Sequence, residues 1–180
     1  MNETLTVADV VRMGPCGLNG EDNGTHYTRS RIKRLWAGRE RLTLMEVLDL
    51  DIPAEDRLWC VLQAVDPRTR VILACDFAGH VLPLFEAKRP DDRRPRAALE
   101  TLQRWLDGEA TDEELDATRA VWAAGPAAWA VGATAEAVWA AWVAGAAAWA
   151  AAGPAAWAAA RATESEWQLA RAREVLRSEP

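Results

Sequence analysis

The sequence predicts an all-α protein, a compact bundle of about seven or eight helices, and three observations support this prediction. Apolar residues recur every three or four positions in most segments, which is the period of a half-buried helix. Residues that favour helix starts and stops stand between those segments. The two-residue alternation of a strand is not sustained over any useful length.

Threonine residues mark the starts of three helices in the N-terminal part. Thr6 and Asp9 have the spacing of a capping box, which opens a first short helix. Thr28 is predicted to cap the second helix, and the polar segment before it, residues 16–27, is predicted to be a loop. A second capping box, Thr43 with Glu46, opens the third helix.

Two longer helices are predicted in the middle of the chain. Pro53 stands in the first turn of one, whose apolar face consists of Leu58, Val61, Leu62 and Val65. Asp66 and Pro67 open the next helix, and Pro83 predicts a kink or a break near its end. The stripe that this helix buries is predicted to be Ile72, Cys75, Leu82 and Phe85.

A charged turn, RPDDRRP at residues 89–95, leads into the next helix. Asp91 or Asp92 is predicted to cap that helix, and Gly108 is predicted to end it. Because the turn mixes both signs of charge, we expect its residues to form caps and ion pairs. The residues predicted to face inward are Leu99, Leu102 and Trp105.

The segment from Val121 to Ala160 is mostly alanine, tryptophan and glycine, and Glu136 is its one charged residue. A membrane span is disfavoured, because the segment has no leucine, isoleucine or phenylalanine and contains the pair Gly153-Pro154. The octapeptide AAGPAAWA occurs twice, and its two Gly-Pro pairs predict corners between helices. Two roles remain open for the large side chains, core packing and a docking surface. These are Trp122, Trp129, Trp139, Trp142, Trp149 and Trp157.

The composition excludes several classes of function. A net charge of −6 disfavours a general nucleic-acid binder and suits a basic protein partner. Three cysteines at unrelated spacings, with no signal-peptide pattern, predict reduced thiols and a cytoplasmic location. The sequence has no phosphate-binding loop, nucleophile elbow or zinc spacing, so no cofactor and no metal are expected. Cys16 and His26, in one loop, are the single candidate pair for nucleophilic catalysis.

The densest charge lies in LDGEATDEELD, which contains no basic residue. One interpretation is structural, since carboxylates complement the dipole at a helix start, and Thr111 with Glu114 has capping-box spacing. The other is an acidic patch that attracts a basic partner, such as the nucleic-acid site of a nuclease. The candidate partner-binding residues are Asp107, Glu109, Asp112, Glu113, Glu114 and Asp116.

Three motifs, DFAGHVLPLFE, RPDDRRPR and WLDGEATDEEL, together with the alanine-rich helical tail, resemble an immunity-protein-like family of bacterial and phage proteins. The resemblance extends from Arg39 to Ala160. It implies an all-α protein that binds and blocks a toxin or effector and is not an enzyme. It brings no catalytic residues with it.

These observations lead to three hypotheses about function. The first is a non-enzymatic, protein-binding inhibitor, an immunity-type or phage-encoded antagonist of a toxin, nuclease or defence effector. The second is a self-assembling structural protein that uses its Ala/Trp helices to form homo-oligomers. The third is an enzyme that uses Cys16 and His26. All three assume one helical domain over residues 1–180, with N-terminal helices in 1–38, a family-like core in 39–120 and the tail in 121–180.

Overall fold

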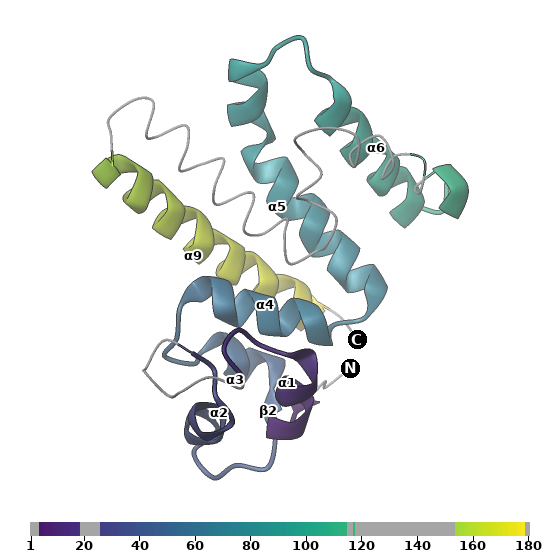
Figure 1. The fold of residues 1–180 in the computed structure, drawn as a ribbon. Helices are drawn as coiled ribbons and strands as arrows, with labels where there is room; N and C mark the ends of the chain where they lie inside the picture. The colour runs from purple at the N-terminus through teal and green to yellow at the C-terminus, as the bar shows by residue number, and fades with distance from the viewer. Residues whose placement is uncertain (1–3, 19–25, 115–116, 118–153, 179–180) are drawn as a thin grey trace.

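The computed structural model describes residues 4–18, 26–114, 117 and 154–178, and this part of the chain is mostly helical, as predicted (Figure 1). A two-stranded sheet is its one other regular element. The strands are β1 (Thr4–Leu5) and β2 (Leu42–Thr43). The helices are α1 (Val7–Met13), α2 (Arg29–Trp36), α3 (Leu44–Leu48), α4 (Ala54–Ala64), α5 (Pro67–Lys88), α6 (Arg94–Leu106) and α9 (Pro154–Ser178).

The predicted threonine caps are all present. In α1 the Asp9 N–H donates to Thr6 Oγ1 at 3.1 Å, and the Thr6 N–H donates to the Asp9 carboxylate at 2.9 Å. Thr43 and Glu46 exchange the same two hydrogen bonds at the start of α3. Thr28 accepts a hydrogen bond from the Arg31 N–H at the start of α2. These side chains satisfy N–H groups that the first helical turn leaves without a partner.

The small sheet was not predicted from the sequence. Thr4 pairs with Thr43, and Leu5 pairs with Leu42, in antiparallel register. Strands of two residues are too short to show the alternation of apolar and polar residues by which a strand is predicted. Trp36 fixes the sheet to α2, because its indole Nε1 donates to the Leu5 carbonyl at 3.1 Å.

Helix α4 buries the predicted face, and all four of its predicted core residues are buried. It begins one residue later than expected, since Pro53 occupies the N-cap position and Ala54 is the first helical residue. Helix α5 then starts at the predicted Asp66 cap, whose carboxylate accepts from the Arg68 and Thr69 N–H groups. It continues through Pro83 without a break.

The stripe predicted for α5 was wrong except at Leu82, which is buried with 6% exposure. The residues that are almost fully buried are Leu73, Phe77 and Val81, whereas Ile72, Cys75 and Phe85 are half-buried. Apolar side chains surround much of this helix, so spacing alone did not single out the buried face. The i, i+4 row of Leu73, Phe77 and Val81 belongs to the main core cluster, to which Leu169, Ala172 and Val175 of α9 also contribute.

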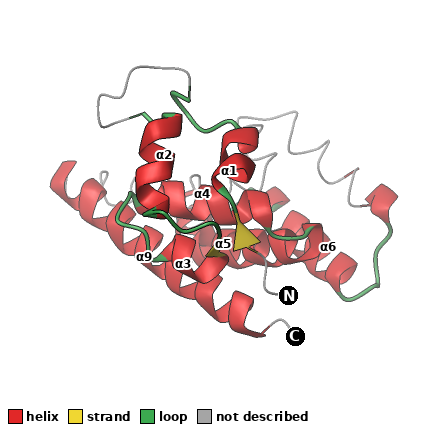
Figure 2. Ribbon diagram, turned by 90° about the horizontal axis from the view of Figure 1, so that it is seen from below, coloured by secondary structure: helices red, strands yellow, loops and turns green. Residues whose placement is uncertain are grey.

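Helices α5 and α6 form a hairpin, and α9 lies across α3, α4 and α5 (Figure 1). Figure 2 shows α1 and α2 together on one side of the longer helices. In α6 the most buried residues are Pro95, Ala98 and Leu106, while the predicted Leu99, Leu102 and Trp105 are half-buried. The Gly-Pro corner at residues 125–126 lies outside the described residues, and at 153–154 the description starts with Pro154.

Candidate protein-binding site

The acidic cluster begins where α6 ends. Asp107 is the C-cap of α6, and Gly108 follows with φ of 77°, a left-handed conformation that glycine adopts without strain. Arg68 of α5 fixes this end of α6, because its guanidinium donates to the Leu106 carbonyl at 2.8 Å. The cluster therefore follows a helix end that is tied to the rest of the fold.

Three of the six candidate carboxylates take part in local structure. Asp107 accepts from the Gln103 side chain at 3.3 Å, and Asp112 accepts from the Trp105 indole at 2.8 Å. Glu114 accepts from the Thr111 N–H at 2.9 Å, and Thr111 Oγ1 accepts from the Glu114 N–H at 3.2 Å. The predicted capping box is therefore confirmed, and the structural interpretation holds for these three residues.

Glu109 and Glu113 are placed differently. Both are exposed, and neither side chain has a hydrogen bond or ion pair within the described residues. The Glu109 backbone is nevertheless held, since its N–H donates to the Arg104 carbonyl and its carbonyl accepts from the Arg104 guanidinium. Within the described residues, Glu109 thus presents an unpaired carboxylate on a held backbone, and Glu113 presents a second one four residues later. Asp116 lies outside the described residues.

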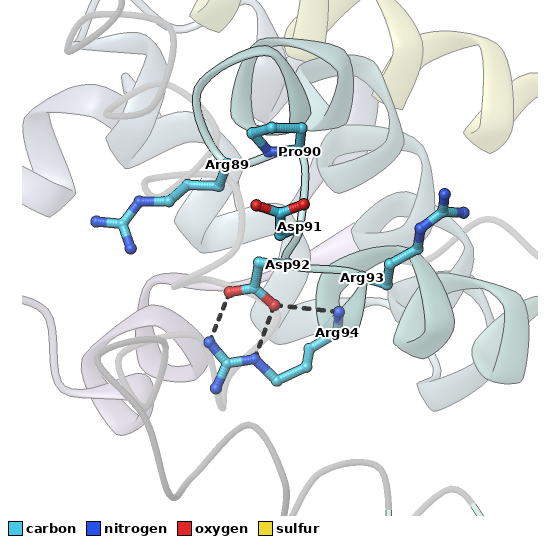
Figure 3. A pocket seen from close by; sticks show the side chains of 6 residues that line it. All are labelled: Arg89, Pro90, Asp91, Asp92, Arg93 and Arg94. Atoms are coloured by element: carbon cyan, nitrogen blue, oxygen red, sulfur yellow. Dashed lines mark hydrogen bonds and ion pairs between the residues drawn. The ribbon is translucent and has the colours of Figure 1, made fainter.

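The charged turn between α5 and α6, which we call the basic turn, lines a shallow hollow of about 700 Å³ with residues 89–94 (Figure 3). Asp92 accepts two hydrogen bonds from the Arg94 guanidinium, at 2.8 and 2.6 Å, and this pairing lowers the pKa of Asp92 to about 2. Its carboxylate also accepts from the Arg94 N–H at 3.2 Å. The expected ion pair is confirmed, whereas the expected cap is not, because Arg93 occupies the N-cap position of α6 and makes no side-chain cap hydrogen bond. The side chains of Arg89 and Arg93 extend away from each other (Figure 3).

The six tryptophan side chains predicted to be core or interface lie outside the described part of the structure. Trp122, Trp129, Trp139, Trp142 and Trp149 lie outside the described residues, and α9 includes Trp157 only as backbone. The choice between core and docking surface stays a prediction for all six.

A polar contact between α5 and α9 was missed by sequence reasoning. The His80 imidazole is 2.8 Å from Glu164, which is 4% exposed, and it stacks on the Trp167 indole with ring centroids 3.6 Å apart. The buried Gln168 amide donates to the other Glu164 oxygen at 3.0 Å. A separation of 84 residues between His80 and Glu164 leaves no local spacing signal. This group fixes α9 against α5.

The Cys16 loop was the candidate for catalysis. Its two ends meet, since the Tyr27 N–H donates to the Cys16 carbonyl at 3.0 Å and the His26 ring packs against Gly17. Cys16 is exposed, and residues 19–25 lie outside the description. The pairing of the Cys16 thiol with the His26 imidazole stays a prediction.

The described part of the chain contains neither a cluster of metal-binding side chains nor a membrane-crossing helix. Within it, no group of three or more His, Cys, Asp or Glu side chains could hold a metal ion. None of the helices described there combines the length and the apolar character that crossing a bilayer requires.

In a comparison with family models, the chain matches the model described as Imm-5 like putative immunity protein over residues 61–154. The match covers just over half of the chain and lies inside the range of the resemblance noted above. It includes the α5–α6 hairpin, the basic turn and the acidic cluster. No curated protein and no solved structure matches the chain.

Proposed function

The chain belongs to the family of Imm-5 like putative immunity proteins, and on this basis we propose that it acts as a non-enzymatic inhibitor that binds a protein partner. The partner class that we propose is a bacterial toxin, nuclease or defence effector, met in the cytoplasm. A phage-encoded antagonist of a host defence enzyme fits the same chemistry.

The observation that carries the proposal is the pair of exposed carboxylates at Glu109 and Glu113, inside the segment that matches the family. The neighbouring Asp112 and Glu114 accept hydrogen bonds from Trp105 and Thr111, whereas these two have no partner in the described residues. Charges of this kind steer an oppositely charged partner and disfavour others, with little cost to the free protein. The net charge of −6 acts in the same direction. We therefore propose that the partner presents a basic surface, as the nucleic-acid site of a nuclease does.

A charge-matched pair of variants tests this proposal. One variant carries Glu109→Gln and Glu113→Gln, and the control carries Glu40→Gln and Asp51→Asn at two other exposed acids. Tagged forms of all three proteins are used to capture partners from the native host lysate. The captured partner is then purified, and its affinity for each form is measured by calorimetry at low and at high salt.

The expected result is one stoichiometric partner that the 109/113 variant binds about tenfold more weakly at low salt, with a smaller difference at high salt because ions screen exposed charges. The control should bind like the parent chain. Equal affinity of all three forms at every salt concentration would refute the electrostatic part. Capture of the chain alone would contradict the inhibitor proposal and would favour assembly through the Ala/Trp segment.

A further inference from the structure

A second candidate site lies between the start of α4 and the middle of α9. The two helices enclose a pocket of about 390 Å³, toward the small end of the usual range for small-ligand sites. Pro53, Glu55 and Arg57 contribute from the α4 side, and Arg161, Ser165 and Glu166 from α9. The side chains that we use below, Arg57, Arg161 and Ser165, lie outside the segment that matches the family model. The pocket is therefore independent of the function proposed above.

Two buried donors at this pocket have no acceptor in the described part of the chain. Ser165 is 3% exposed, and its Oγ makes no hydrogen bond there. Arg57 Nε is likewise buried without a partner, although Nη1 of the same guanidinium donates to the Leu48 carbonyl at 3.0 Å. Buried polar groups are almost always paired in native proteins, so two orphans at one pocket indicate an absent acceptor.

The helix start beside these donors points to the same kind of ligand. Pro53 occupies the N-cap position of α4 and has no side-chain oxygen to accept from the first-turn N–H groups. The N-terminal end of an 11-residue helix carries a partial positive charge that favours an anion. An acceptor with negative charge would thus satisfy the serine, the arginine and the helix end together.

The acidic side chains of the pocket limit how much charge the ligand can carry. Arg161 pairs with Glu55 at 3.3 Å, and Arg57 lies 3.9 Å from Glu166, whose side chain is 69% exposed. The second distance exceeds the 2.7–2.9 Å typical of a charge-assisted hydrogen bond, so Glu166 holds Arg57 only loosely. The two carboxylates, Glu55 and Glu166, would repel a ligand with two negative charges, such as a phosphate dianion, more strongly than a ligand with one, such as a carboxylate.

We propose that the α4–α9 pocket binds a carboxylate group, which accepts from Ser165 Oγ and Arg57 Nε and lies near the Arg161 guanidinium. The group belongs either to a small organic acid or to an acidic side chain of a polypeptide. Both sources offer the same two oxygens, and the probes below separate them.

The full chain, labelled with nitrogen-15, is titrated with three probes while amide shifts are followed. Glutarate represents a small acid, the capped peptide acetyl-Ala-Glu-Ala-amide represents a polypeptide, and inorganic phosphate represents a dianion. Ser165→Ala is the test variant, and Thr163→Ala on the same helix is the control, because Thr163 is exposed and does not line the pocket.

We expect saturable shifts centred on residues 53–57 and 161–166 for a carboxylate probe, with weaker binding of phosphate. Ser165→Ala should lower the affinity for the carboxylate probe about tenfold, because it removes a hydrogen bond to a charged group. Thr163→Ala should leave this affinity unchanged. Tighter binding of the peptide identifies a polypeptide source, and tighter binding of glutarate identifies a small acid.

Thermal melts give a second measurement, which does not depend on the size of the amide chemical-shift changes. Without ligand, Ser165→Ala should melt at the same temperature as the parent chain or higher, because the variant removes an unpaired buried hydroxyl. It should also lose the rise in melting temperature that glutarate or the peptide gives the parent. Absence of saturable shifts with both carboxylate probes, or equal affinity in the Ser165→Ala variant, would overturn the proposal.

Discussion

Phe77→Ala is the substitution that most directly tests how α5 packs in the core. Phe77 is 0% exposed, and its ring meets the Trp167 indole edge to face, with centroids 6.3 Å apart. Its neighbours on the stripe, Leu73 and Val81, are 0% and 1% exposed, so they have little freedom to move into the space that the ring leaves. Truncation of a buried phenylalanine typically costs about 3–5 kcal/mol, and limited collapse favours the upper half of this range. We therefore expect a loss of about 4–5 kcal/mol in the free energy of unfolding.

Urea unfolding followed by far-ultraviolet circular dichroism measures this loss. Leu84→Ala is the matched control, because Leu84 lies on the same helix with 41% exposure and should cost less than about 1 kcal/mol. A stability of about 5–15 kcal/mol is usual for a domain, so the Phe77 variant should lose a large fraction of it. If the two variants lost equal stability, the assignment of the buried α5 face would be refuted.

Four other outcomes are expected. Iodoacetamide should label the exposed Cys16 quickly and Cys60 very slowly, because burial raises the pKa of the Cys60 thiol to about 12. Mass spectrometry of the native protein measures both labelling rates. Asp66 has a lowered pKa because its carboxylate accepts from the Thr69 hydroxyl. Its contribution to stability is therefore present above its unfolded pKa and is lost as the pH falls through the lower pKa of the folded state. In urea titrations below about pH 4, the unfolding free energy of Asp66→Asn should therefore fall less steeply with pH than that of the parent chain. Thr43→Ala should cost about 1 kcal/mol in the same titrations at neutral pH, because it removes the cap of α3. In thermal melts, Trp139→Ala and Trp149→Ala should each cost about 3–5 kcal/mol if the indoles are core residues, whereas a small cost would indicate a docking surface.

The features that were predictable from the sequence are the local ones. A capping box needs two residues three positions apart, so Thr6 with Asp9, and Thr43 with Glu46, could be read directly. The buried face of α4 was predictable because polar residues occupy its other side. In each case the physical cause lies within one or two helical turns.

The features that were missed depend on residues far apart in the chain. The buried face of α5 is chosen by the elements that pack against it, and the helix itself is too apolar to reveal which face that is. The contact between His80 and Glu164 joins residues 84 positions apart. In the acidic cluster, composition identified the charged residues but could not separate Asp112, which accepts from Trp105, from Glu113, which has no partner among the described residues.

The position of α9 has a consequence for how the chain folds during synthesis. Its contacts reach back a long way, since Arg161 pairs with Glu55 and the Arg173 guanidinium donates to the Leu48 carbonyl, 125 residues earlier. Until α9 has left the ribosome, the apolar faces that α4 and α5 turn toward it have no cover from Leu169, Ala172 and Val175. Closing such long loops is slow, and nascent chains with uncovered apolar faces are targets for chaperones and proteases. A mutation in α9 should therefore lower the yield of intact protein in cells more than a mutation in α1 or α2 that costs the same free energy of unfolding.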